Sequence, residues 1–241
     1  MLGKIVLGTE IYMSERFSRV WVNAAKKYMP PNIDVLIFDN NVNDQGEGSR
    51  IAKTACAENG WLYHKMMPGC LQCHSVDMLY WYAACKPAEI FVHLDIDCPP
   101  LEGVVEGIIA PVKAGASAAT EIGGAHCFAV RVSDVRDMSA QRLPIYRGEK
   151  ETRFSQWITY SPEDQYGRRF FDHCRWVFHD LEKRGLRVDI TNFGFLHAGV
   201  ASLGKVKSTR YQDCVRVPGV VEAFAERHAE FWADPRIREL M

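Results

Sequence analysis

The feature that most constrains this chain is an apolar run, 91–100, that ends in two aspartates, Asp95 and Asp97, separated by Ile96. Side chains alternate along a strand, so both acids should project from one face while Ile96 is buried on the other. Two carboxylates about 7 Å apart at the end of a buried strand repel each other and lose hydration, and a divalent cation relieves both problems. The run therefore predicts a metal site at a strand end. Acids that are solvated or that cap the next turn are the alternative.

Composition narrows the class of protein. A chain of 241 residues can bury one domain, and a net charge of −1 with dispersed basic residues gives no electrostatic surface for nucleic acid. The apolar start ends before Glu10 and is too short for a signal peptide or a membrane span, so we expect a cytoplasmic protein, at most peripheral at a membrane. The eight cysteines favour free thiols. Cys70, Cys73 and His74 have the spacing of half a zinc site, but no second half completes it.

Strands and helices alternate through the first hundred residues. Short apolar runs bounded by turn residues indicate strands, and apolar residues at helical spacing indicate helices. The expected order is a strand at 4–7 that extends toward Thr9, a helix at 14–28, a strand at 33–39, a helix at 49–59, a strand at 61–65, a helix at 73–85 and the strand with the two acids. Such alternation predicts an α/β fold with a mostly parallel central sheet flanked by helices.

The second half of the chain is less regular. We expect a short helix near 101–109, a strand at 127–132 and a long loop region at 134–157, which either covers a site or is simple irregular structure. Ser161 and Pro162, followed by two acids, are typical of a helix start, and that helix should continue to Arg184 and stop at Gly185. A strand should follow at 186–190. A final amphipathic helix at 220–232 either packs on the domain or forms the contact of a homo-oligomer.

Acidic residues gather where the expected parallel strands end. Asp39, Asp95 and Asp97 all fall at carboxyl ends of strands, and ligands of such sheets bind beyond that edge. Asp39 alone is equally well explained as an Asx-turn that starts the following loop. His197 stands among glycines and apolar residues, where it is either a hydrogen-bonded structural residue or a metal ligand.

In this order the motifs resemble those of glycosyltransferases of the A-type (GT-A) fold, most closely the large inverting family that includes rhamnosyltransferases and many enzymes of polysaccharide biosynthesis. The resemblance covers about residues 4–203, which leaves 204–241 as a C-terminal helical extension of a single domain, 1–241. Five features match: the opening strand, the second strand ending in Asp39, the Asp-x-Asp at Asp95 and Asp97, Glu163-Asp164 followed by Arg169, and His197 with a nearby glycine and serine.

The resemblance implies a reaction and a role for each matching residue. The reaction is transfer of a sugar from a nucleotide diphosphate, UDP above all, to a hydroxyl of a carbohydrate or lipid-linked acceptor, with inversion and with Mn²⁺ or Mg²⁺ on the diphosphate. The implied roles are as follows: Asp39 binds the nucleotide base with Thr9 and Glu10 beside it, Asp95 faces the ribose, Asp97 holds the metal, His197 completes the metal or phosphate contacts, and Asp164 is the general base. Asp172 is a rival base. Asp180 is another, although an exposed acid on an amphipathic helix explains it more simply.

Three other functions stay open. His93, Asp95 and Asp97 also resemble one metal-binding segment of arginase-type two-metal hydrolases, but the Asp-Ala-His-x-Asp and Gly-Gly-Asp-His segments of those enzymes do not occur here. A nucleotidyltransferase that makes sugar nucleotides should carry a glycine-rich, basic loop after the first strand, and the segment 8–12 lacks one. A non-catalytic module that binds a nucleotide or a sugar is the third.

Overall fold

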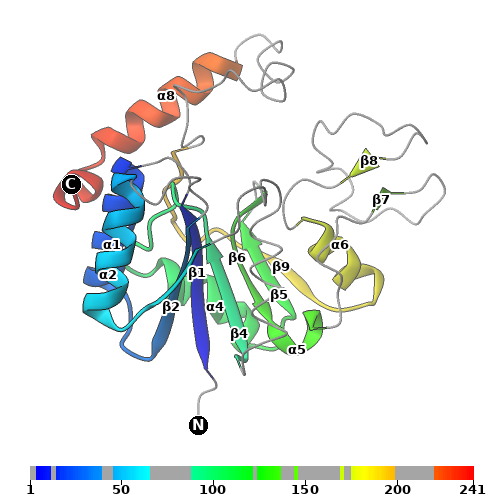
Figure 1. Ribbon diagram of the computed structural model, residues 1–241. Coiled ribbons are helices and arrows are strands. Elements are labelled where there is room, and N and C mark those ends of the chain that lie inside the picture. Colours follow the sequence, from blue (N-terminus) through cyan, green and yellow to red (C-terminus); the bar gives the residue numbers. More distant parts are fainter. Residues whose placement is uncertain are drawn as a thin grey trace.

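The structure, a computed structural model, describes residues 4–11, 15–39, 46–65, 88–121, 124–136, 144–145, 169–170, 175–198 and 220–241. Its centre is a seven-stranded sheet in the order β3-β2-β1-β4-β6-β5-β9 (Figure 1). The strands are β1 (Ile5–Ile11), β2 (Ile33–Asp39), β3 (Leu62–Lys65), β4 (Ile90–Leu94), β5 (Ala118–Glu121), β6 (Gly124–Arg131) and β9 (Val188–Ile190). Two short strands, β7 (Pro144–Ile145) and β8 (Arg169–Phe170), form a separate antiparallel pair.

The sheet is mixed but mostly parallel. Strands β3, β2, β1 and β4 run parallel to one another, β6 is antiparallel to both β4 and β5, and β5 is parallel to β9. The prediction of a mostly parallel sheet flanked by helices is therefore confirmed. Because β2, β1 and β4 are parallel, the residues that follow them lie along the same edge of the sheet.

Helices cover both faces of this sheet (Figure 1). One face carries α1 (Glu15–Tyr28), α2 (Glu47–Asn59) and α4 (Val104–Lys113), which share a single apolar cluster with α8 (Val220–Ala233) and α9 (Pro235–Glu239). The other face carries α5 (Val132–Val135) and α6 (Arg175–Lys183), where Phe178 packs edge-on against Phe128 of β6. The expected helices and strands of the first half appear close to their predicted bounds, except that the helix at 73–85 lies outside the described residues.

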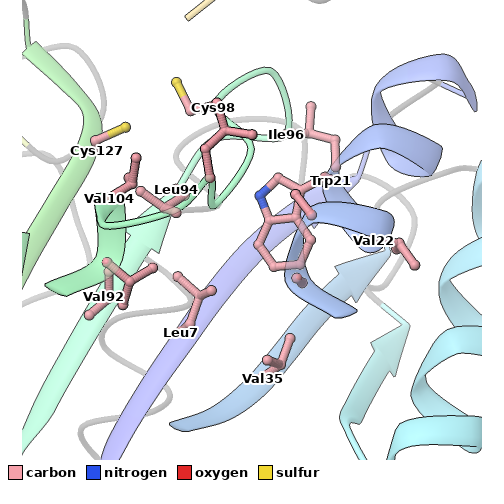
Figure 2. Packing of buried hydrophobic residues seen from close by; sticks show 14 of the residues in the cluster. Leu7, Trp21, Val22, Val35, Val92, Leu94, Ile96, Cys98, Val104 and Cys127 are labelled. Carbon is pink, nitrogen blue, oxygen red and sulfur yellow. The ribbon is translucent and has the colours of Figure 1, made fainter. Parts of the chain in front are cut away.

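The core explains why β4 sits at the centre. All five residues of β4 are buried, as an almost continuous apolar sequence requires when helices cover both faces. Val92 and Leu94 pack toward Trp21 of α1 and Val104 of α4, and Figure 2 shows Trp21 lying across the strands at the middle of this cluster. The strand therefore ends at a fixed position, and the residues after Leu94 emerge from a rigid platform.

The prediction of one continuous helix from Pro162 to Arg184 is wrong. Arg169 and Phe170 form strand β8 opposite β7, so no continuous helix can run through them. Helix α6 begins at Arg175 and ends, as predicted, before Gly185, which takes a positive φ of 75° that favours glycine. The helix-start pattern at Ser161 and Pro162 lies outside the described residues.

The C-terminal helices pack on the domain. Phe231 of α8 contacts Phe17 of α1 with ring centroids 5.6 Å apart, and the side chain of Asn23 donates a hydrogen bond of 2.7 Å to the carbonyl oxygen of Leu240. Lys27 and Glu239 form an ion pair at 2.5 Å on the same side. The C-terminal helix therefore packs on the domain, as one of the two alternatives predicted. A homo-oligomer contact, the other alternative, stays a prediction. None of the helices in the described part of the chain has the length and apolar character needed to cross a bilayer.

Candidate active site

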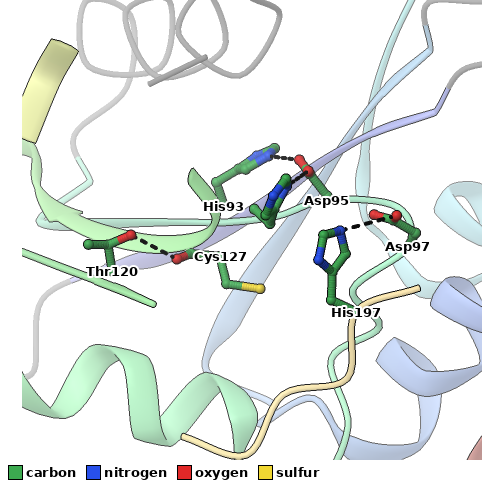
Figure 3. Close-up of polar contacts among 7 residues, drawn as sticks. His93, Asp95, Asp97, Thr120, Cys127 and His197 are labelled. Atoms are coloured by element: carbon green, nitrogen blue, oxygen red, sulfur yellow. Dashed lines mark hydrogen bonds and ion pairs between the residues drawn. The ribbon is translucent and has the colours of Figure 1, made fainter. Parts of the chain in front are cut away.

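The two acids that opened the sequence argument lie in a turn. Strand β4 ends at Leu94, and the N–H of Cys98 donates a hydrogen bond of 2.8 Å to the carbonyl oxygen of Asp95, which closes a turn over residues 95–98. The expectation that Asp95 and Asp97 share one face of a strand is therefore wrong, because alternation stops where the turn begins. Figure 3 shows the consequence: Asp95 pairs with His93, whereas Asp97 pairs with His197.

Asp95 is held by two imidazoles. His93 Nε2 lies 2.7 Å from Asp95 Oδ1, and His126 Nδ1 lies 2.9 Å from Asp95 Oδ2. Burial alone would raise the pKa of Asp95, but the hydrogen bonds from His126 and His93 outweigh it and hold that pKa well below its usual value. Burial opposes the protonated form of His126, yet its pKa is raised because the hydrogen bond and charge of Asp95 favour that form. Both oxygens of Asp95 are thus engaged within the protein.

Asp97 forms a different pair. Its Oδ2 lies 3.3 Å from Nε2 of His197, and the side chains are only 6% and 11% exposed. The backbone joins the same two segments, since the N–H of Ala198 donates a hydrogen bond of 3.2 Å to the carbonyl oxygen of Asp97. The His197 ring also stacks on the His126 ring, with centroids 4.0 Å apart. Asp97 therefore faces an imidazole that comes from a distant part of the chain.

The segment that delivers His197, residues 192–198, is seated against α4. A Cβ placed on Gly107 of α4 would come within 2.7 Å of the Cβ of Phe193, so only glycine permits this approach. Gly194 has a φ of 70°, and its N–H donates a hydrogen bond to the side-chain oxygen of Asn192, which fixes the bend after Phe193. Close packing at Gly107 thus sets where His197 meets Asp97.

Two thiols lie beside this pair. Cys98 and Cys127 are free thiols, and both are buried. Figure 2 shows both sulfur atoms on the same side of the apolar cluster. Burial raises the pKa of Cys98 well above its usual value, so the thiol is protonated when no cation is bound. Among the described residues, one group of three metal-ligating types comes together: Asp97, Cys98 and His197 offer atoms that all lie within 4.8 Å of one another.

Asp39, the residue predicted to bind the nucleotide base, lies at the end of β2. This residue ends β2 and is fully buried, its Oδ2 accepts a hydrogen bond of 2.6 Å from the Tyr63 hydroxyl, and Lys65 Nζ lies 3.4 Å away. Thr9 of β1 is also fully buried, and its hydroxyl has no hydrogen-bond partner within the described ranges. Glu10 is half-buried and points to the opposite face of the sheet from Thr9. Asp39 and Thr9 therefore lie on the predicted edge, with strand β1 between β2 and β4.

Of the three candidate bases, the structure describes Asp180. Asp164 and Asp172 lie outside the described residues, as do Cys70, Cys73 and His74. Asp180 is described: it lies on α6 and forms an ion pair of 3.7 Å with Arg184, which directly follows that helix. That contact is the one expected of an acid on the outer face of an amphipathic helix.

A cavity of about 470 Å³ opens beside the Asp97–His197 pair. One wall is formed by β5, β6 and the segment at 195–197, and the other wall by α8 and the residue that follows it. The lining combines three acids, two histidines, one arginine and apolar side chains: Glu121, Glu230, Asp234, His126, His197, Arg227, Phe195, Leu196 and Phe231. Carboxylates that accept hydrogen bonds from hydroxyl groups, next to aromatic rings, suit a polyhydroxylated ligand.

Several of these residues were not predicted from the sequence. His126, Glu121, Arg227 and the two thiols received no role. His93 carried a signal that could have been used, because residues two apart on a strand share a face and His93 precedes Asp95 by two positions. His126 carried none, because its place opposite Asp95 depends on the antiparallel register of β6 against β4.

Comparison with known proteins identifies the class to which this fold belongs. No protein-family model and no curated protein matches the chain. Among solved structures, the chain is similar to glucosyl-3-phosphoglycerate synthase from Mycobacterium tuberculosis in complex with Mn²⁺, UDP and glucosyl-3-phosphoglycerate, with a TM-score of 0.53, 10% identity, and coverage of 95% of this chain and 81% of that chain. The fold is therefore the A-type fold of nucleotide-sugar glycosyltransferases.

Other complexes of the same synthase match less extensively. The complex with Mn²⁺ and UDP-glucose gives a TM-score of 0.49 at 12% identity and covers 81% of this chain and 71% of that chain. The complex with phosphoglyceric acid gives 0.41 at 11% identity and covers 56% of this chain. In that last match the chain spans 58% of the length of the synthase. At 10% identity, the match with a TM-score of 0.53 establishes the fold alone.

Proposed function

We propose that this protein is a metal-dependent glycosyltransferase that moves a sugar from a nucleotide-diphosphate donor, UDP above all, to a hydroxyl of a carbohydrate or lipid-linked acceptor with inversion. The observation that carries the proposal is the buried Asp97–His197 pair, which stands at the carboxyl edge of a sheet with the A-type fold. Ligands of open α/β sheets bind at that edge.

The residues of the pair fit a divalent cation. Two ligands about 2.1 Å from one ion, at an angle between tetrahedral and octahedral, stand about 3.0–3.4 Å apart. The separation of 3.3 Å between Asp97 Oδ2 and His197 Nε2 falls in this range. A carboxylate and an imidazole are both ligands of Mn²⁺, and such a cation, when bound, neutralises charge that develops on the departing diphosphate. Asp95 is the poorer ligand, because both of its oxygens already face histidines.

The nucleotide base and the ribose are assigned to the strand ends beside this pair. Asp39 would accept a hydrogen bond from the base, with Tyr63 and Lys65 holding its carboxylate in place. The unpartnered hydroxyl of Thr9 supports a polar ligand near β1, since a buried hydroxyl without a partner is costly. Asp95 would contact the ribose only with the exposed part of its carboxylate. Glu10 would line the nucleotide pocket from the face of β1 opposite to Thr9.

The acceptor would enter the cavity between β6 and α8. Its hydroxyl oxygen forms a bond to the anomeric carbon of the donor as the bond from that carbon to the phosphate oxygen breaks, and the hydroxyl proton passes to a carboxylate. We assign that carboxylate to Asp164, with Asp172 as the rival. Glu230 on the α8 side would accept hydrogen bonds from other acceptor hydroxyls, and the rings of Phe195 and Phe231 would contact the apolar face of the acceptor.

A thermal-shift screen tests the proposal directly. The full chain is heated with UDP-, GDP- or dTDP-sugars, with and without Mn²⁺. A ligand present at 100 times its Kd stabilises the native state by about 2.7 kcal/mol, which for a chain of this size raises Tm by about 5–10 °C. We expect the shift with a UDP-sugar only when Mn²⁺ is present. No stabilisation by any nucleotide sugar in either condition contradicts the proposal.

A further inference from the structure

The turn after β4 brings a thiol to the proposed metal pair. Asp97 and Cys98 are consecutive residues of a turn that the Cys98 N–H closes on the Asp95 carbonyl, and His197 approaches from the segment at 192–198. The carboxylate, thiol and imidazole atoms lie within 4.8 Å of one another, and Asp97 and Cys98 are 5% and 1% exposed. A carboxylate with an imidazole suits a hard cation, whereas a thiolate added to that set favours a softer one.

The cluster can contract to a coordination geometry without rebuilding the backbone. Ligands of a tetrahedral cation stand about 3.3–3.8 Å apart, so the loosest contact has to close by about 1 Å. The oxygen–nitrogen edge is already 3.3 Å long. Rotation of the Cys98 side chain about its Cα–Cβ bond supplies the remaining movement.

We propose that Asp97, Cys98 and His197 form a three-ligand site for a soft divalent cation of the Zn²⁺ class. On binding, the S–H bond of Cys98 breaks, a sulfur–metal bond forms, and the proton is released to water. With three protein ligands a four-coordinate cation keeps a single open position, whereas a six-coordinate Mn²⁺ held by Asp97 and His197 keeps four. A Zn²⁺-class cation would therefore compete with Mn²⁺ and accept only one diphosphate oxygen, which makes it an inhibitor.

The binding step stands on this cluster alone, and the inhibitory consequence rests on the proposed glycosyltransferase function. The two are tested separately. Binding is measured without nucleotide, so its outcome does not depend on whether the donor has been identified correctly. Inhibition is measured afterwards, as the Zn²⁺ concentration that halves Mn²⁺-dependent donor turnover.

Co²⁺ serves as the spectroscopic probe because its bond to a thiolate gives a charge-transfer absorption that carboxylates and imidazoles do not give. The full chain carries Cys70→Ser and Cys73→Ser throughout, since these residues and His74 form a separate half-site in the sequence. Cys98→Ser is compared with Cys56→Ser, a matched control that removes another buried thiol, on α2, whose present contact is the carbonyl oxygen of Leu62. Zn²⁺ affinity is measured for every variant by titration calorimetry, which does not depend on the charge-transfer band.

We expect the charge-transfer band in the parent and in Cys56→Ser, and its loss in Cys98→Ser together with a fall in Zn²⁺ affinity of about 10–100-fold or more. A second variant, His197→Gln, keeps the thiol and should weaken Zn²⁺ to a similar degree, so the proposal is tested even if Cys98→Ser does not fold. The Zn²⁺ concentration for half inhibition should rise at least tenfold in Cys98→Ser. A band that survives in Cys98→Ser, a parent with no band, or unchanged Zn²⁺ affinity in His197→Gln would overturn the proposal. If the band behaves as expected but no Mn²⁺-dependent donor turnover exists, the proposed function fails and the metal site stands.

Discussion

Asp95 and Asp97 are separated by one residue and belong to two differently built regions. The first region, the β4–β6 cluster of His93, Asp95 and His126, is assembled by neighbouring strands, and both oxygens of its acid face imidazoles. The second region, formed by Asp97 and Cys98, the segment at 192–198 and α8, is assembled by connections and a terminal helix, and its acid meets one imidazole at 3.3 Å. The difference indicates a division of work: the sheet fixes a saturated carboxylate, and the connections hold a carboxylate that can still accept a ligand.

The division predicts opposite phenotypes for the same substitution at the two acids. Asp97→Asn removes the charge that would hold the cation, so Mn²⁺-dependent donor turnover should fall on the order of 10²–10³-fold, equivalent to several kcal/mol of transition-state stabilisation. Its free energy of unfolding should change little. The matched control is Asp34→Asn at the other end of β2, where the carboxylate is 43% exposed and pairs with Lys4. Turnover that is equal in Asp97→Asn and Asp34→Asn would remove the metal assignment.

Asp95→Asn should act mainly on stability. The neutral amide of asparagine cannot replace the hydrogen bonds that the Asp95 carboxylate forms with both His93 and His126. The two imidazoles also lose the negative charge beside them. Because the Asp95 side chain is 30% exposed, water replaces part of the loss, and we expect the free energy of unfolding to fall by about 1–3 kcal/mol. Urea denaturation measures this change. A stability equal to that of Asp97→Asn would mean that the two acids are not differently built.

Gly107→Ala tests the connection that carries His197. The added Cβ would meet the Phe193 Cβ at 2.7 Å, and since that atom is next to the backbone, the segment at 192–198 has to move. Overpacking of this kind costs about 1–3 kcal/mol, and we expect Mn²⁺ affinity, measured by titration calorimetry, to fall by about tenfold or more as His197 shifts from Asp97. Gly48→Ala on α2 is the control, because its nearest neighbour is the Ser18 hydroxyl on α1. If Gly107→Ala binds Mn²⁺ as tightly as Gly48→Ala does, the seating at α4 does not position His197.

More of the central sheet than of the candidate site could be predicted from the sequence. Ile33–Asp39 and Ile90–Leu94 are nearly continuous apolar runs, a pattern that predicts strands buried on both faces of a parallel sheet. The structure shows both runs as buried strands. The predicted continuation of the strand through Asp97 is wrong, because the N–H of Cys98 donates a hydrogen bond to the carbonyl oxygen of Asp95 and the chain turns there. The polar residue that contacts Asp95 from the strand is His93, whose Nε2 lies 2.7 Å from Asp95 Oδ1.

Residues joined by tertiary contacts could not be read from local pattern. His126 meets Asp95 only because β6 is antiparallel to β4 in one particular register, and no local property of 124–131 specifies that partner. His197 was predicted as a site residue, but Gly107, which allows its segment to approach, lies in a different element. In the sequence, Gly107 is an isolated glycine within a helical pattern, which by itself indicates no contact. Arg227 and Glu230 reach the cavity because α8 folds back onto α1, a docking that an amphipathic pattern permits without specifying.

The packing of α8 on α1 gives the smallest predicted effect. It is a pH dependence of stability that arises in the second region. Burial, together with the positive charge of Arg16, lowers the pKa of His228 on α8, and the indole N–H of Trp232 donates a hydrogen bond of 3.0 Å to His228 Nε2, which requires that nitrogen to be unprotonated. A histidine with a lowered folded-state pKa contributes stability that is complete above its unfolded pKa of about 6.5 and is lost as pH falls through the folded value. Urea denaturation of the parent should therefore show a loss of stability on acidification below about pH 6.5 that His228→Gln lacks. An identical loss in both proteins would place the acid-sensitive contact elsewhere, and a loss on raising the pH would reverse the assigned sign.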